Sequence, residues 1–190
     1  MSAMNTAMTG LTWDDFLALP EDDAYKHAEL IDGELVMNPP SWLHQRIAMR
    51  LMGAVDRWTQ EGPDRGEVTF NPAVKIDETR GYLPDVAWYP EDRRSPPEEP
   101  AGVKGVPAFV TEVLSPTTRT IDALRKRVDY ARAGVDEFWL IDPELPVVQV
   151  YRRQADADEF AFVLEVGPDR ELTSPLLPGF AVTLGALLRR

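Results

Sequence analysis

The chain has 190 residues, 44% of them hydrophobic, which is enough apolar material for one globular domain over residues 1–190. Its 32 acidic and 20 basic residues give a formal charge of −12, which argues against a protein that coats nucleic acid through a broad positive surface. There is no cysteine, which excludes disulfides, thiolate metal sites and cysteine nucleophiles. No secretory signal or membrane-spanning run is found, so we expect a cytoplasmic protein with no membrane partner.

The first predicted elements are a short helix and a hairpin. Residues 1–10 are small and polar and are expected to be flexible. Thr12 is expected to cap a helix through TWDDFLAL, whose first turn carries two aspartates that the helix dipole favours. The stretch AELIDGELVMN predicts two strands joined at Asp32 and Gly33, a dipeptide suited to a tight primed turn.

The longest helical pattern begins at Ser41 and runs through SWLHQRIAMRLMGAVDRWTQ, with Gly62 just beyond its end. Its apolar residues recur at helical spacing and define one apolar face: Leu43, Ile47, Leu51, Ala54, Val55 and Trp58. This pattern predicts an amphipathic helix packed on a core.

The remaining elements are mostly strands. Strand-like pieces lie in GEVTFNPAVKI and YLPDVAWYP, and a loop rich in proline and charge follows at residues 91–105. The strand FVTEVLS comes next, then a helix from about Thr120 to Ala133 that ends at Gly134. EFWLID, PVVQVYRR and FAFVLEV are three more strands, and the tail adds a strand and a helical turn. The order predicts an α/β (α+β mixed) fold, a mixed central β-sheet flanked by α-helices with extra β-hairpins.

A carboxylate stands inside an apolar strand at Glu112. An unpaired buried charge costs several kcal/mol, so this side chain needs a cation, a hydrogen-bond network or access to solvent. Asp85 follows a proline and precedes the apolar Val86, Ala87 and Trp88. If the two strands are neighbours, both carboxylates could hold a hard divalent cation such as Mg²⁺.

Two further charged residues are candidates for the same place. Glu29 lies among apolar residues at the start of a strand, and Lys126 lies on the helix that follows the Glu112 strand. Alternatives stay open for both. Glu29 could only hydrogen-bond near the hairpin. Lys126 lies nearly opposite an apolar stripe of Ile121, Leu124, Val128 and Ala131, which is typical of a solvated lysine, and with Asp122 it could form a surface ion pair.

Structural roles are also open for the other candidates. Glu112 could cap a backbone amide or pair with Arg119, and Asp85 could be a turn residue. We expect His27 at the surface, and His44, in the first turn of the long helix, as a packing or capping residue. The tryptophans are expected mostly in the core, without a stacking platform for bases, and they are Trp13, Trp42, Trp58, Trp88 and Trp139.

An ordered series of motifs resembles a known family. ELIDGELVM, a Pro-Pro pair, His44 with Gln45, LPDVAWY, VTEVLSPTTRTIDALRK, YARAGVDEFWLIDP and VVQVY follow one another between Leu11 and Tyr151. Together they are similar to the Uma family of restriction endonucleases, a branch of the PD-(D/E)XK nuclease superfamily.

The resemblance implies a restriction-endonuclease-like core with Asp85 and Glu112 as metal ligands and the backbone carbonyl of Val113 as a further ligand. Where the superfamily pattern has lysine, this chain has Leu114. The Uma branch carries its lysine on the following helix in a D-x-x-x-K arrangement, which Asp122 and Lys126 fit. Glu29 matches an early glutamate of the pattern and His44 matches a further family position.

The function that the resemblance implies is a Mg²⁺- or Mn²⁺-dependent endonuclease acting on DNA, with Glu29, Asp85, Glu112 and Lys126 as its catalytic set. A metal held by two carboxylates stabilises the charge that develops on the phosphate, and a lysine can position a water or neutralise the phosphate. Cutting both strands would suit a homodimer. The alternative is a non-catalytic binding or regulatory module that keeps the nuclease fold, which the charge of −12 and the displaced lysine favour.

Overall fold

The computed structural model describes residues 9–20, 22–23, 25–93, 105–115, 121–155 and 157–189, without the side chains of residues 121 and 122. Several sequence predictions fall outside this part of the chain. They are the flexible segment up to residue 8, most of the loop at 91–105, the Arg119 alternative and the side chain of Asp122. The first three residues of that loop are described and form a 3-10 turn, η1 (Glu91–Arg93).

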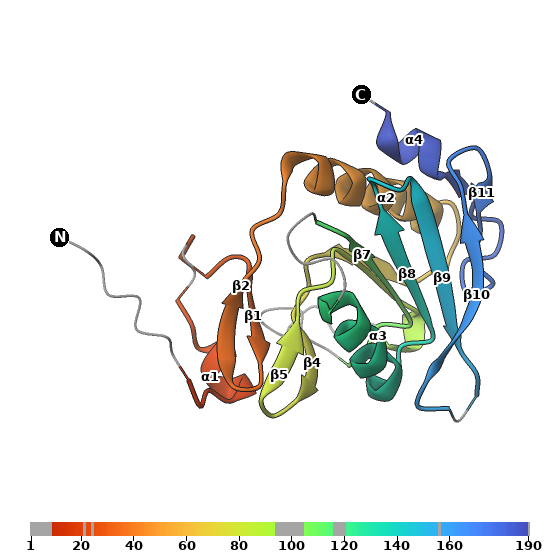
Figure 1. The fold of residues 1–190 in the computed structure, drawn as a ribbon. Helices are drawn as coiled ribbons and strands as arrows, with labels where there is room; N and C mark the ends of the chain where they lie inside the picture. The colour runs from red at the N-terminus through yellow and green to blue at the C-terminus, as the bar shows by residue number, and fades with distance from the viewer. Residues whose placement is uncertain are drawn as a thin grey trace.

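A six-stranded mixed sheet organises the molecule, as the sequence predicts (Figure 1). Its strand order is β10-β9-β8-β7-β6-β3. The parallel pair is β7 with β8, and the other four pairs are antiparallel. The strand bounds are β3 Glu67–Phe70, β6 Val86–Tyr89, β7 Phe109–Val113, β8 Glu137–Asp142, β9 Val147–Arg153 and β10 Phe160–Val166.

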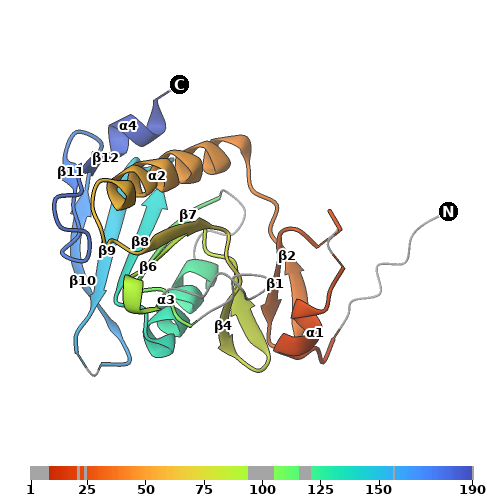
Figure 2. The same cartoon turned by 180° about the vertical axis from the view of Figure 1, so that it is seen from behind.

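Two helices cover the two faces of this sheet, α2 (Trp42–Gln60) and α3 (Ile121–Ala133) (Figures 1 and 2). The alternation of side chains along each strand explains the arrangement. Val86 and Trp88 of β6 pack in the core cluster that contains α2, whereas Ala87 and Tyr89 pack in the cluster that contains Tyr130 of α3. Successive residues of β6 therefore face α2 and α3 in turn.

A second sheet of four strands, in the order β2-β1-β5-β4, lies beside the first. Its strands are β1 Ala28–Ile31, β2 Glu34–Met37, β4 Val74–Asp77 and β5 Arg80–Tyr82. The predicted turn between β1 and β2 is confirmed, because Asp32 (φ 53°) and Gly33 (φ 78°) both have the left-handed backbone of a primed turn. Helix α1 (Trp13–Leu17) begins at the predicted cap Thr12. Trp13 packs so closely on Gly81 of β5 that an added Cβ would stand 1.9 Å from its ring.

The C-terminal elements complete the first face. A two-stranded sheet of β11 (Glu171–Leu172) and β12 (Val182–Thr183) leads into α4 (Leu184–Leu188), which lies beside α2 (Figure 1). Arg50 of α2 donates to the backbone carbonyls of Leu187 and Arg189. None of the helices in the described ranges has the length and apolar character needed to cross a lipid bilayer.

One tryptophan departs from the prediction. Trp13, Trp58, Trp88 and Trp139 are buried, but Trp42 is 72% exposed. It lies on the face of α2 that points away from the sheet, where Arg46 stacks over its ring at 4.4 Å. A tryptophan in the first turn of an amphipathic helix is buried only if it falls on the apolar face, and Trp42 falls opposite Ile47 and Leu51.

Candidate active site

The register of two neighbouring strands places Asp85 opposite Glu112. β6 and β7 form an antiparallel ladder in which Val86 pairs with Thr111. One step beyond that pair, the same register brings Asp85 against Glu112, and residues directly opposite in such a ladder have Cβ atoms about 5 Å apart. Strand alternation directs both side chains to the face that α3 covers. The two carboxylates that the sequence singled out therefore come together.

The Asp85 carboxylate is held from two sides. Its Oδ1 lies 2.6 Å from Nε2 of His44, and its Oδ2 accepts a hydrogen bond from the backbone N–H of Val113 at 2.7 Å. His44 is in the first turn of α2, where Ser41, the predicted start of the helical pattern, accepts a hydrogen bond from its backbone N–H. Asp85 thus ties the start of α2 to the end of β7, a role the packing interpretation of His44 missed.

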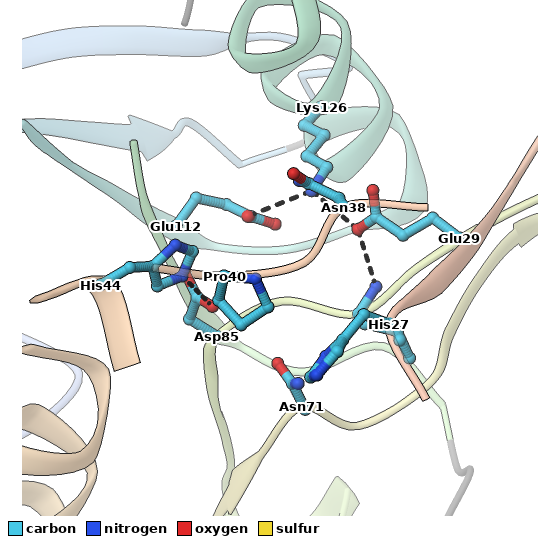
Figure 3. Close-up of a pocket in the computed structure, with 10 residues that line it drawn as sticks. His27, Glu29, Asn38, Pro40, His44, Asn71, Asp85, Glu112 and Lys126 are labelled. Carbon is cyan, nitrogen blue, oxygen red and sulfur yellow. Dashed lines mark hydrogen bonds and ion pairs between the residues drawn. The ribbon is translucent and has the colours of Figure 1, made fainter. Parts of the chain in front are cut away.

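The Glu112 carboxylate meets two donors from α3. Oε1 accepts from the hydroxyl of Tyr130 at 2.6 Å, and Oε2 accepts from Nζ of Lys126 at 3.1 Å. The same ammonium donates to Oε1 of Glu29 at 2.7 Å. Glu29 also accepts from the backbone N–H of Leu83 at 3.1 Å. Figure 3 shows Lys126 reaching in from α3 toward the carboxylates of Glu29 on β1 and Glu112 on β7.

The burial of Lys126 corrects the helical-wheel interpretation of α3. Lys126 is only 2% exposed, whereas Leu124 and Val128, predicted to be apolar core residues, are 48% and 38% exposed. Ala131 is buried, as predicted. The helix is rotated relative to its apolar stripe because the two buried carboxylates of β1 and β7 need a cation, and an unpaired buried charge costs more than an exposed leucine or valine.

A second polar cluster fixes the rotation of α3. Asp129, one turn after Lys126, is buried and accepts from Nη1 of Arg80 at 3.2 Å and from the hydroxyl of Tyr82 at 2.5 Å. The ring of Tyr82 meets the ring of Tyr130 edge to face at 5.6 Å. These contacts anchor the polar face of α3 to β5, and so they hold Lys126 over the carboxylates.

The charges of the site are unbalanced. Three carboxylates, those of Glu29, Asp85 and Glu112, line one cavity with a single ammonium, that of Lys126. The pKa of Glu112 is raised to about 8, first of all by burial; the charge of Lys126 lowers it, the charges of Asp85 and Glu29 raise it, and the Tyr130 hydrogen bond lowers it. Burial and the neighbouring Glu112 also raise the pKa of Tyr130, so its hydroxyl keeps its proton and remains a donor.

The cavity between these groups is small and polar (Figure 3). Its volume is about 30 Å³, room for an ion or a water molecule and far less than a nucleotide needs. Besides the four charged residues, its lining is His27, Asn38, Pro40, His44, Asn71 and Leu83. His27 was expected at the surface, but it is half-buried and lines this cavity.

Three lining or contacting residues were missed in the sequence. Tyr130 lies four residues after Lys126, and His27 lies two residues before Glu29, so helix and strand periodicity would have placed each beside its partner. Asn71 gave no such signal. It follows β3 with a left-handed backbone (φ 52°), and its position depends on the path of the chain between the two sheets.

The donor set fits a hard divalent cation by its chemistry. Within the described residues, no group of three or more His, Asp or Glu side chains is arranged to hold a metal ion as it stands. The reason is visible in the contacts: Lys126 lies against Glu29 and Glu112, and His44 lies against Asp85. Two carboxylates that face one water-sized space, with excess negative charge, are nevertheless the oxygen ligands that Mg²⁺ prefers.

Comparison with known proteins supports a restriction-endonuclease-like architecture. A crystal structure described as "a putative nuclease belonging to DUF820" from Anabaena variabilis has a similar fold, with a TM-score of 0.76 and 22% sequence identity. The superposition covers 94% of this chain and 97% of that one. A search of curated proteins gives no match.

The sequence matches the model of one protein family. Residues 13–185 match the Uma2 model, whose description is "Putative restriction endonuclease". The match covers nearly the whole chain, including all four charged residues of the cavity. The chain belongs to the Uma2 family.

Proposed function

We propose that this protein is a metal-dependent endonuclease that hydrolyses phosphodiester bonds of DNA with Mg²⁺ or Mn²⁺. The observation that carries the proposal is the convergence of Asp85 and Glu112 from neighbouring strands with Lys126 from α3 on one cavity. The family description "Putative restriction endonuclease" and the fold shared with a protein described as "a putative nuclease" support the same class.

Asp85 and Glu112 would hold the cation, with the backbone carbonyl of Val113 as a further ligand. When bound, a divalent cation would stabilise the negative charge that builds on the phosphate oxygens and lower the pKa of a coordinated water. Above pH 8, where Glu112 is deprotonated, the excess of negative charge in the cavity favours such an ion, since the ammonium of Lys126 offsets one of three carboxylates. His44 positions Asp85 through the 2.6 Å contact to Oδ1.

Lys126 supplies the second positive charge beside the reacting phosphate. Glu29 and Glu112 hold its ammonium at 2.7 and 3.1 Å, so the side chain is oriented before any substrate arrives. An oriented ammonium in a buried site can stabilise the charge on the phosphate or position the attacking water. Glu29 therefore acts on the reaction through Lys126.

The test is cleavage of supercoiled plasmid DNA by the purified protein with Mg²⁺, with Mn²⁺ and with EDTA. We expect metal-dependent nicking that Asp85→Ala abolishes and that Asp169→Ala, at an exposed position, leaves unchanged. Linear product formed without accumulation of nicked circles would indicate two sites acting together in a symmetric homodimer. DNA binding without cleavage under all conditions would instead identify a module that keeps the fold but not the turnover.

A further inference from the structure

The carboxylate cavity is too small to contain a nucleotide. Asp85 and Glu112 are 7% and 9% exposed, and the space between them is about 30 Å³. Of the parts of a nucleotide, only the phosphate oxygens are small enough to approach these carboxylates. The base and sugar of a substrate must therefore lie outside the cavity. A neighbouring surface must receive them.

A larger pocket adjoins the cavity. Its volume is about 440 Å³, within the range of small-molecule sites, and it shares Asn71 and Leu83 with the carboxylate cavity. Its other walls come from α1 and the segment before β1, chiefly Phe16, Leu19 and Tyr25. The two spaces therefore lie next to each other, with Asn71 and Leu83 in the lining of both.

The lining of this pocket suits an uncharged aromatic ring. Phe16, Leu19, Tyr25 and Leu83 offer aromatic and aliphatic surface, and nucleobases unstacked from their neighbours are commonly held against such side chains. The carboxylates of Asp22 and Asp23 also line it. Lys26 lines it too and pairs with Asp23 at 3.9 Å, so the two acids are offset by one cation, and their oxygens can accept hydrogen bonds from the amino groups of a base.

Asn71 is the polar residue that lines both spaces. Asn71 has a left-handed backbone (φ 52°), which asparagine adopts more readily than most residues other than glycine. Its backbone N–H approaches the carbonyl oxygen of Asp85 at 3.4 Å. Asn71 lines both spaces, at the point where a base would join its phosphate.

Resting on the proposed nuclease function, we propose that the pocket of Phe16, Tyr25 and Leu83 receives the base of the nucleotide next to the scissile phosphate, turned out of the base stack. A base inside an intact duplex must first be unpaired and unstacked, which costs a few kcal/mol. The preferred substrates are therefore single-stranded or unpaired segments of nucleic acid, and intact duplex is cut more slowly.

A different surface could also stack bases and serves as the competitor. Trp42 and Met49 are exposed on α2 beside Arg46 and Arg50, around a hollow of about 420 Å³. This patch lies on the face of α2 opposite the one that carries His44, so it does not adjoin the carboxylate cavity. The adjoining pocket is favoured because it shares two residues with that cavity.

The experiment compares cleavage of a fluorescein-labelled 20-nucleotide strand, the same strand with one abasic residue, and its duplex, all with Mn²⁺. We expect the single strand to be cut at least ten-fold faster than the duplex. Tyr25→Ala should lower the single-strand rate about ten-fold, Tyr25→Phe should preserve it, and Phe162→Ala, an exposed aromatic on β10, should not change it. At the bond beside the abasic residue, wild type and Tyr25→Ala should cut equally slowly.

Fluorescence anisotropy with Ca²⁺ in place of Mn²⁺ measures binding of the same oligonucleotides without relying on cleavage. The proposal is supported if the protein binds the single strand more tightly than the duplex and if Tyr25→Ala weakens that binding. If the same protein cuts no substrate, the nuclease function fails and the base pocket stands. Equal rates on duplex and single strand with an active Tyr25→Ala variant overturn the base pocket and leave the nuclease function standing. Loss of single-strand cleavage in Trp42→Ala but not in Tyr25→Ala also overturns it.

Discussion

The ammonium of Lys126 donates a 2.7 Å hydrogen bond to Glu29, a residue 97 positions earlier in the sequence. This contact joins α3, which covers the large sheet, to β1 of the small sheet, and its second partner is Glu112 of the large sheet. One buried side chain therefore links three elements and orients the candidate site. Its removal should affect folding and activity together.

Lys126→Met should destabilise the protein by about 3–5 kcal/mol near pH 8, because it leaves buried carboxylates without their cation. Cleavage of DNA should also be lost. Urea unfolding monitored by tryptophan fluorescence measures the change in the free energy of unfolding. Lys75→Met is the matched control: Lys75 pairs with Glu78 at the surface, and its loss should cost less than about 1 kcal/mol. Equal costs for the two variants would contradict the buried arrangement.

The stability of the metal-free protein should fall as the pH rises from about 4.5 to about 8. The pKa of Glu112 is about 8 in the folded chain against an ordinary value of 4.5, so the folded state binds a proton that the unfolded state has released. The contribution of Glu112 is fully present below pH 4.5 and lost above pH 8. Melting temperatures across this range measure it.

Glu112→Gln isolates the pH-dependent contribution of Glu112 to stability, since an amide does not titrate. Its melting temperature in EDTA should decline less between pH 4.5 and 8 than that of the wild type. Mn²⁺ should raise the wild-type melting temperature more at pH 8 than at pH 6, because the ion binds the deprotonated carboxylate, and it should have little effect on the variant. If the melting temperatures of wild type and variant change with pH in parallel, Glu112 does not titrate between pH 4.5 and 8.

Tyr130→Phe removes the hydroxyl that donates to Glu112 at 2.6 Å. Above pH 8, where Glu112 is ionised, the expected cost is about 1.5–3 kcal/mol, the range for a hydrogen bond to a charged group. The pKa of Glu112 should rise further, since this bond lowers it, so the stability loss should extend to higher pH. Tyr151→Phe, which removes a hydrogen bond to the neutral Gln149, is the control and should leave the pH profile unchanged.

His44→Ala should raise the Mn²⁺ concentration needed for half-maximal cleavage by about 10–100-fold, the usual effect of removing a group that orients a metal ligand. The imidazole holds Oδ1 of Asp85 at 2.6 Å, so its loss lets the carboxylate turn. His44→Gln keeps a donor at similar reach and should recover part of the affinity. A cleavage rate that falls equally at all Mn²⁺ concentrations would point away from a positioning role.

Asn71→Gly should keep the fold, because glycine adopts a positive φ without strain, and should remove the amide at the junction of the two spaces. Asn71→Ala should destabilise the protein by about 1 kcal/mol or more, because alanine is disfavoured at that φ. If the amide contacts the nucleotide, both variants should bind single strands more weakly. Thermal melts and anisotropy separate the two effects.

Local patterns in the sequence predicted much of the fold. The primed turn at Asp32 and Gly33, the start of α2 at Ser41 and the apolar face of α2 are properties of a few neighbouring residues, and they appear as expected. The pairing of Asp85 with Glu112 was also within reach, because both carboxylates border apolar strands. Their roles as metal ligands stay predictions.

The rest depended on contacts between distant segments. The apolar stripe of α3 indicated a solvated Lys126, yet the carboxylates of β1 and β7 rotate the helix so that Lys126 is buried and Leu124 is exposed. No pattern within α3 carries that information, because it comes from charges on two other elements. The pocket at Asn71 is likewise formed by segments that the sequence keeps apart.

The central claim is that Asp85 and Glu112 share one divalent cation. The most direct test is anomalous diffraction at the manganese edge from crystals grown with Mn²⁺, compared with crystals of Asp85→Ala. The account predicts one anomalous peak bonded to oxygens of both carboxylates in the wild type and no peak there in the variant. A manganese ion bound elsewhere, or a cavity without an ion while Lys126 keeps its contacts to Glu29 and Glu112, would contradict it.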